Sequence, residues 1–232
     1  KAWAIDAENG RIRWKVDGIG NETNLISNNS PAVSGKYALF GFGNGEIYAT
    51  FKKGGYVLWS SSLSGRGDSR VLSAIDDIVA SPAIVGRNAY AADGSGKVVS
   101  LKIENGERNW TAPFGSSGNF WIAGKSLFFI SDTNKLVRLE MKTGKTVWLT
   151  ELPSFSQKRL LRNKKSNQHH GPIIAGNQLV IVSSDGYIRF YDPKTGEQRN
   201  KLKIKAGATA NPIVVNETLY LITQDGKLRA FR

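Results

Sequence analysis

The fold of this chain is decided by residues 127–148, LFFISDTNKLVRLEMKTGKTVW: an apolar run, a tight turn, a second strand, a glycine-containing turn and a tryptophan on a third strand. The same phrase recurs at residues 37–59, 89–110 and 179–200, and half-copies stand at residues 1–14 and 219–232. Strand-forming residues alternate within it, as in Glu46 to Phe51, so that one set of side chains lies on each face of a sheet. The repeat is therefore the structural unit.

The spacing of the repeat predicts its architecture. Trp14, Trp59, Trp110 and Trp148 occupy equivalent places, Asn200 takes the next one, and successive positions are 38 to 52 residues apart. With about four strands per unit, this spacing is typical of β-propeller blades, which bury their faces against their neighbours. The apolar content of 40% supplies a core, and no apolar periodicity indicates a long helix. We predict an all-β propeller of four-stranded antiparallel blades.

One propeller portion is expected to cover residues 1–232. We place its blades at about residues 30–63, 81–114, 120–152 and 171–204, with partial blades at 1–20 and 211–232. The repeated tryptophan follows the glycine turn, and we expect it to lock one blade against the next through a large buried area. Asn200 in that place predicts a weaker contact.

The recurring acidic residues and glycines have a structural interpretation. Residues that tolerate positive φ favour tight hairpins between paired strands. We therefore assign the recurring aspartates to turn formation rather than catalysis, and we assign the repeated glycines to turns as well. The aspartates are Asp93, Asp132, Asp185 and Asp225, and the glycines are Gly10, Gly55, Gly106, Gly144 and Gly196.

Residues 4–14 (AIDAENGRIRW) and 139–148 (LEMKTGKTVW) resemble the repeat named after the cofactor pyrroloquinoline quinone. That repeat occurs both in quinoprotein dehydrogenases and in propellers that bind no cofactor, so it indicates a fold more than a function. Within this superfamily the chain resembles the BamB family, the lipoprotein propellers of the bacterial outer-membrane β-barrel assembly (BAM) machinery. The resemblance runs through residues 29–31, 43–45, 70–77, 81–85 and 224–232.

The resemblance implies an eight-bladed ring of which this chain is the C-terminal portion. It also implies a non-enzymatic scaffold without a cofactor, at the periplasmic face of the outer membrane, whose lipid anchor lies outside this chain. The implied partner is the barrel-forming, BamA-like subunit. Unfolded outer-membrane proteins are a further candidate partner, through pairing with a blade-edge strand.

Two inter-blade loops, residues 21–29 and 67–80, correspond to the loops through which the family engages the barrel-forming subunit. Leu25 matches a family leucine, whereas Ile26 stands where the family has arginine. Asp76 and Asp77 lie near the family's acidic pair, with a different spacing. The predicted partner-binding residues are Leu25, Ile26, Asp76 and Asp77.

The formal charge of +13 calls for an acidic partner or surface. The lysines and arginines are dispersed along the chain and no nucleic-acid motif is present, so we expect no nucleic acid as a partner. Anionic lipid headgroups or lipopolysaccharide fit the charge better. A basic surface also maintains solubility. Residues 154–170 (SFSQKRLLRNKKSNQHH) are predicted to form a loop, either solvated or docking an acidic partner or the membrane. His169 and His170 are adjacent and lack a third ligand, so no metal site is expected.

Two other functions share this fold. A quinoprotein dehydrogenase needs a cofactor cavity, a calcium site, a catalytic aspartate and, in many members, an adjacent cysteine pair. The chain contains no cysteine, and no nucleophile–base constellation is evident in it. A propeller that binds a polysaccharide or another periplasmic ligand remains an open alternative.

Overall fold

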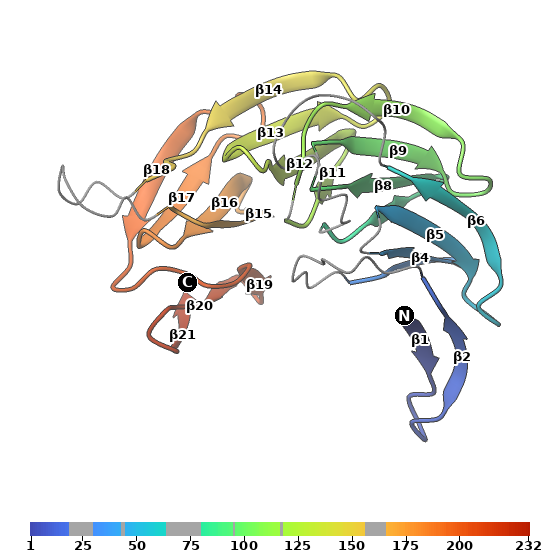
Figure 1. Cartoon of the computed structure of the whole chain (residues 1–232). Helices are drawn as coiled ribbons and strands as arrows, with labels where there is room; N and C mark the ends of the chain where they lie inside the picture. Colours follow the sequence, from blue (N-terminus) through green and yellow to red (C-terminus); the bar gives the residue numbers. More distant parts are fainter. Residues whose placement is uncertain (19–29, 43–44, 64–79, 95, 117, 156–165) are drawn as a thin grey trace. The chain divides into compact units, whose positions relative to one another are not determined.

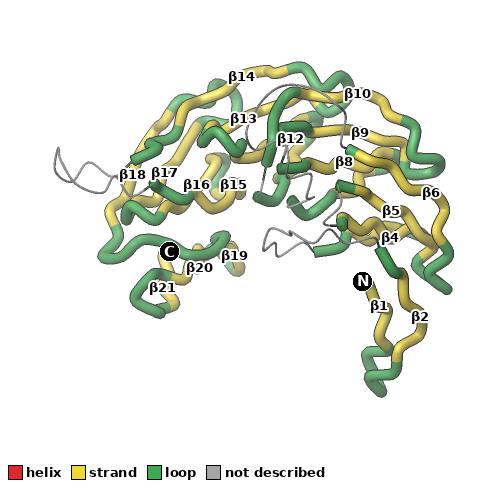
Figure 2. Tube along the Cα trace, in the orientation of Figure 1, coloured by secondary structure: helices red, strands yellow, loops and turns green. Residues whose placement is uncertain are grey.

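The computed structural model describes residues 1–18, 30–42, 45–63, 80–94, 96–116, 118–155 and 166–232. Its regular structure throughout these ranges is β-strand, and Figure 2 shows strands joined by loops and turns without a helix. The all-β prediction is confirmed. The described residues accordingly contain no helix with the length and apolarity needed to cross a membrane.

The chain forms two compact units, the first of which comprises residues Lys1–Phe120 with Met141–Lys145. Its sheets are antiparallel meanders, in which each strand pairs with the next along the chain (Figure 1). A two-stranded sheet holds β1 (Ala2–Ile5) and β2 (Ile12–Val16). The first blade holds β3 (Ala32–Ser34), β4 (Tyr37–Gly41), β5 (Glu46–Phe51) and β6 (Val57–Ser62). The second holds β7 (Ala83–Val85), β8 (Asn88–Ala92), β9 (Val98–Lys102) and β10 (Arg108–Ala112).

The second unit comprises Trp121–Glu140 with Thr146–Arg232 and has the same construction. One blade holds β11 (Trp121–Ala123), β12 (Ser126–Ile130), β13 (Lys135–Glu140) and β14 (Thr146–Glu151). The next holds β15 (His169–Ala175), β16 (Gln178–Ser183), β17 (Tyr187–Tyr191) and β18 (Gln198–Lys203). A three-stranded sheet follows with β19 (Ile213–Val215), β20 (Thr218–Ile222) and β21 (Leu228–Phe231).

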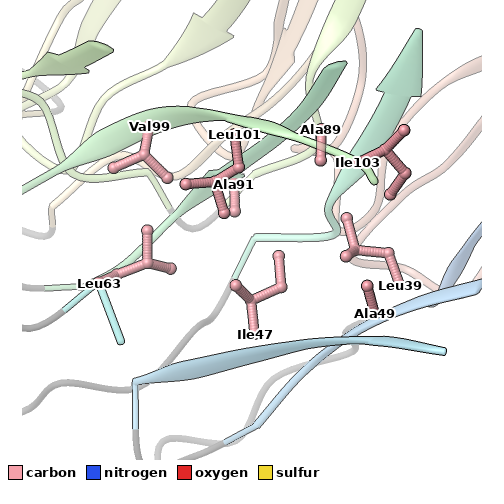
Figure 3. Close-up of a cluster of buried hydrophobic side chains, with 9 residues drawn as sticks. All are labelled: Leu39, Ile47, Ala49, Leu63, Ala89, Ala91, Val99, Leu101 and Ile103. Atoms are coloured by element: carbon pink, nitrogen blue, oxygen red, sulfur yellow. The ribbon is translucent and has the colours of Figure 1, made fainter. Parts of the chain in front are cut away.

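Apolar side chains of neighbouring blades pack face to face. In the first unit, Leu39 and Ile47 of the β3–β6 blade lie against Val99 and Leu101 of the β7–β10 blade, as Figure 3 shows. All four side chains are completely buried. Burial of each such side chain stabilises the fold by about 2 kcal/mol relative to exposure. A matching cluster that includes Leu136 joins the β11–β14 and β15–β18 blades of the second unit.

The repeated tryptophans form a second contact between blades, which confirms their predicted role as locks. Each indole Nε1 donates a hydrogen bond to a backbone carbonyl in the last turn of the following blade. The acceptor always lies three residues before the turn glycine. The pairs are Trp14 to Lys52 (3.1 Å), Trp59 to Ile103 (2.8 Å), Trp110 to Met141 (2.9 Å) and Trp148 to Pro193 (3.2 Å).

The indole rings also explain why these turns carry glycine. A Cβ atom added at Gly55, Gly106, Gly144 or Gly196 would lie 2.5 to 2.7 Å from the ring of the preceding tryptophan. These glycines are therefore turn residues, as predicted, and in addition they provide the surface on which the indole packs. Asn200, in the tryptophan position of β18, is exposed, and its Oδ1 accepts a hydrogen bond from the N–H of Lys201 instead (2.8 Å).

Gly106→Ala is expected to destabilise the protein more than the matched change Gly86→Ala. Both positions have positive φ, +74° and +58°, so the backbone cost of alanine is about 1 kcal/mol at each. A Cβ at Gly106 would lie 2.7 Å from the Trp59 ring, whereas at Gly86 it meets nothing within 4 Å. We expect the clash to add about 1–3 kcal/mol. Urea unfolding curves of both variants measure this difference, and equal losses would contradict the packing role.

Candidate functional site

All four residues predicted to bind a partner, Leu25, Ile26, Asp76 and Asp77, lie outside the described residues. The structure instead describes the points at which the two loop segments, residues 19–29 and 64–79, leave and re-enter the sheets. We call these flanking residues the loop stems. The first segment runs from β2 to β3 and the second from β6 to β7. Each segment thus joins the last strand of one sheet to the first strand of the next. In an antiparallel meander this connection lies at the same end of the blade as the hairpin between the two middle strands.

The stem of the first segment passes over an aromatic pair. Gly18 lies so close to Phe42 that a Cβ atom would be 2.3 Å from the ring, so only glycine fits without a shift. The Phe42 ring meets Tyr48 edge to face at 4.9 Å between centroids. The Tyr48 hydroxyl donates to the carboxylate of Glu46 (3.0 Å). Burial is the largest cause of the raised pKa of Tyr48, and the hydrogen bond to Glu46 is the second. This aromatic pair fixes the path of the chain just before the segment begins.

The stem of the second segment is held by backbone and side-chain bonds. Leu63 is completely buried, and its N–H donates to the carbonyl of Gly45 in the β4–β5 hairpin (2.9 Å). The side chain of Lys97 donates to the Leu63 carbonyl (3.4 Å), and Arg108 donates to the carbonyl of Ser62 (2.9 Å). Ala80, where the chain re-enters the described part, is also completely buried. The second segment therefore begins and ends at fixed points.

A hydrogen bond between neighbouring blades joins the two stems. The backbone N–H of Ser30 donates to the side-chain oxygen of Ser81 (3.1 Å). The second unit has the equivalent bond, from the N–H of Gly171 to the side-chain oxygen of Asn211 (2.8 Å). In both cases the donor residue and the acceptor residue each precede a proline; three of these prolines stand just before an innermost strand, and Pro172 lies within β15. The prolines after Ser30 and Ser81 were a visible sequence signal, but the bond between the serines was not foreseen. It places the residue at which the chain re-enters the sheets after the first segment beside the corresponding residue after the second segment.

Three of the four recurring aspartates bond within their own hairpins, which supports their assignment to turns. Asp93 is completely buried, and its Oδ1 accepts the N–H of Lys97 (2.8 Å). Asp225 accepts the hydroxyl of Thr223 (2.5 Å), and this bond is the largest cause of the lowered pKa of that carboxyl group. Asp185 forms an ion pair with Arg189. Asp132 is exposed; in its hairpin, the Ser131 side chain accepts the N–H of Lys135 instead (3.1 Å).

A buried serine and a half-buried histidine meet in the β15–β18 blade, but their surroundings do not suit catalysis. The Nε2 of His169 donates to the carbonyl of Pro153 (3.1 Å), so the neutral ring accepts the Ser183 hydroxyl at Nδ1 (2.7 Å). Burial, as the largest cause, lowers the pKa of His169 and favours this neutral form. Ser183 is completely buried, and its oxygen also accepts a bond from Arg189 (2.9 Å). Because no substrate can reach the hydroxyl, we assign this network to the packing of the blade.

Of the predicted basic loop, residues 156–165, with Lys158, Arg159, Arg162, Lys164 and Lys165, lie outside the described residues. The prediction that the loop extends to residue 170 is wrong, because His169 and His170 begin β15. A bridge between Phe155 and Ser166 closes the base of the segment. The strand forms because both histidines pair in register with Ser183 and Val182 of β16.

Metal ligands are not grouped in the part of the chain that the structure describes: no three His, Asp or Glu side chains there could hold an ion together. A hollow of about 670 Å³ lies between the β11–β14 and β15–β18 blades. Arg138 in its wall donates to Ser126 and to the carbonyls of Pro193 and Lys194. Asp192 and Arg199 form an ion pair there. Arg138 thus serves the contact between blades, whereas the ion pair lies within the β15–β18 blade.

Comparisons with known proteins extend this description. The sequence model of the family described as outer membrane protein assembly factor BamB matches residues 1–150 and 132–232. The relative of that name in Shewanella oneidensis is 24% identical over 226 residues, covering 97% of this chain and 54% of the relative. The relative in Legionella pneumophila is 28% identical over 205 residues, covering 88% of this chain and 50% of the relative. The chain therefore spans about half the length of these curated relatives.

Solved structures agree on the fold. The crystal structure of BamB from Moraxella catarrhalis matches with a TM-score of 0.81 at 19% identity, covering 98% of this chain and 65% of that one. A europium-containing methanol dehydrogenase matches with a TM-score of 0.64 at 13% identity, covering 87% of this chain and 47% of that one. The predicted β-propeller fold with quinoprotein-type repeats is confirmed, and the eight-bladed ring stays a prediction. The family match extends over both units, and the chain belongs to the family of outer membrane protein assembly factor BamB.

Proposed function

We propose that the protein is a non-enzymatic scaffold subunit of the outer-membrane β-barrel assembly machinery. In this proposal it binds the barrel-forming, BamA-like subunit and aids the insertion of outer-membrane proteins. It acts at the periplasmic face of the outer membrane, with a lipid anchor in the full-length protein. The observation that carries the proposal is the match of the assembly-factor family to residues 1–150 and 132–232.

The proposed contact uses Leu25 and Ile26 from one loop segment and Asp76 and Asp77 from the next. An apolar anchor beside carboxylates gives a partner both buried area and an oriented set of hydrogen bonds. The stems support this arrangement, because the bond from Ser30 to Ser81 holds the residues that follow the two segments next to each other. Fixed stems also reduce the conformational entropy that the loops lose on binding.

We further propose that the sheets described above are the C-terminal blades of an eight-bladed ring. The outermost strand of each blade has one unpaired edge, which offers backbone groups to an extended chain. Unfolded outer-membrane proteins are a second proposed partner for such an edge. No cofactor and no nucleic acid take part in this function.

Alanine substitutions at Leu25, Ile26, Asp76 and Asp77 are expected to weaken binding to the barrel-forming subunit. Loss of a contact at the centre of an interface costs more than about 1 kcal/mol, so we expect Kd to rise roughly tenfold for the strongest of these variants. Surface plasmon resonance with the full-length protein and the immobilised periplasmic part of the partner measures this change.

Matched controls exist for both kinds of side chain. Asp132→Ala removes an exposed carboxylate from a hairpin of the second unit, and Leu228→Ala removes a leucine that is 68% exposed. Neither change should alter Kd. Unchanged affinity in all four loop variants would refute the contact, while failure of the wild-type protein to bind the subunit would refute the scaffold function itself.

Calorimetry distinguishes the scaffold from a quinoprotein dehydrogenase. We expect no saturable heat when pyrroloquinoline quinone and calcium are added together to the full-length protein, since the described residues hold no cluster of three or more acidic or histidine ligands. A saturable, calcium-dependent heat would instead favour the dehydrogenase. Addition of calcium alone serves as the blank.

A further inference from the structure

The β3–β6 blade carries a second hollow at the end opposite the loop stems. It has a volume of about 420 Å³ and is lined by Gly35, Lys36, Phe51, Lys52 and Lys53, and we call it the lysine hollow. The first two residues belong to the turn between β3 and β4, and the others lie at the end of β5 and in the turn that follows. Two turns of one blade therefore form its walls.

Both walls are held in place. The N–H of Lys52 donates to the carbonyl of Lys36 (2.8 Å), which ties the two turns together. Beneath them the rings of Tyr37 and Phe51 stack, with centroids 6.4 Å apart and planes 14° from parallel. The Lys36 ammonium lies 5.3 Å and 5.7 Å from the centres of these two rings. The Trp14 indole donates to the carbonyl of Lys52, so the lock between blades also steadies this turn.

Three lysines gather around the lysine hollow. Lys36, Lys52 and Lys53 are exposed, and none of them forms an ion pair with a carboxylate among the described residues. The like charges of three lysines that line one hollow repel each other, and an anion bound among them relieves that repulsion.

The next blade carries an ion pair at the equivalent place. Arg87 corresponds to Lys36, because each follows the glycine of the first turn. Glu104 corresponds to Lys53, because each lies two residues before the glycine of the last turn. Arg87 and Glu104 form an ion pair at 2.9 Å. In the β3–β6 blade Lys53 stands in the place of that acid, so this ion pair has no counterpart among the described residues of the blade.

We propose that the lysine hollow binds a phosphate group, supplied by the headgroup of an anionic phospholipid or by free phosphate. A phosphate carries more than one negative charge and several acceptor oxygens, and it therefore matches three ammonium donors better than a single carboxylate does. Phospholipid headgroups and inorganic phosphate present the same group to the lysines. Because the hollow and the loop stems lie at opposite ends of the blade, phosphate and a partner protein can bind at the same time.

Titration of the isotopically labelled protein with inorganic phosphate, followed by amide chemical shifts, tests the site directly. We expect saturable shifts at Lys36, Lys52 and Lys53, and none at Arg87, whose place is neutralised by its ion pair. Lys53→Glu restores the acid found in the next blade and reverses one charge beside the bound anion. We expect this change to weaken phosphate binding at least about tenfold.

Lys203→Glu is the matched control, because it makes the same change of charge at an exposed lysine of β18, outside the hollow. It should leave phosphate binding within about twofold, since Lys203 does not line the hollow and the charge of an exposed side chain is screened by salt. Absence of saturable shifts in the wild-type protein, or an equal loss in both variants, would overturn the proposal.

Vesicles identify the source of the phosphate group. Cosedimentation with phosphatidylcholine vesicles that contain phosphatidylglycerol is compared with pure phosphatidylcholine. If Lys53→Glu reduces the binding that depends on phosphatidylglycerol while Lys203→Glu does not, the headgroup is the ligand. If neither variant changes vesicle binding and the phosphate titration behaves as expected, free phosphate is the ligand. Both results support the site.

Discussion

The packing of a tryptophan indole on the glycine turn of the following blade is the contact on which the rest of the structure depends. Glycine and tryptophan stand close together in the copies at residues 37–59, 89–110 and 127–148, yet they are not partners: Gly106 receives the ring of Trp59, while Trp110 reaches forward to Gly144. Each of these three blades both receives an indole and provides one. Stability in such an array is the sum of unit and nearest-neighbour terms, and this contact contributes to the neighbour term.

The form of this contact leaves the turns free to vary in sequence. The indole bonds to a backbone carbonyl, so the acceptor residue can be Lys52, Ile103, Met141 or Pro193 without loss of the bond. Side chains in the turns are therefore available for other purposes. The β7–β10 blade uses its turn for an internal ion pair, whereas the β3–β6 blade gathers lysines there. The turns of the two blades thus have the same backbone geometry but carry different charges.

The two ends of a blade consequently have different tasks. The end with short turns carries the locks and the lysine hollow, and its backbone is fixed by hydrogen bonds within a few residues. The other end carries long connections, whose stems are held by Gly18 against Phe42, by the buried Leu63 and by the bond from Ser30 to Ser81. Long loops on fixed stems are the usual place for recognition on a rigid scaffold. This division supports the assignment of partner binding to the loop end.

The sequence by itself determined the strands, the hairpins and the turn roles of Gly106 and Asp93, because alternation and turn chemistry act over a few neighbouring residues. It also indicated that Trp59 joins blades, since a large aromatic residue recurring in every copy needs a shared packing surface. Only the tertiary structure decided that Gly106 is that surface, that Ser30 bonds Ser81, and that His169 belongs to a strand. The candidate contact residue Leu25 rests on family resemblance alone. Contacts between residues some fifty positions apart depend on how the blades are placed, and no local pattern encodes that placement.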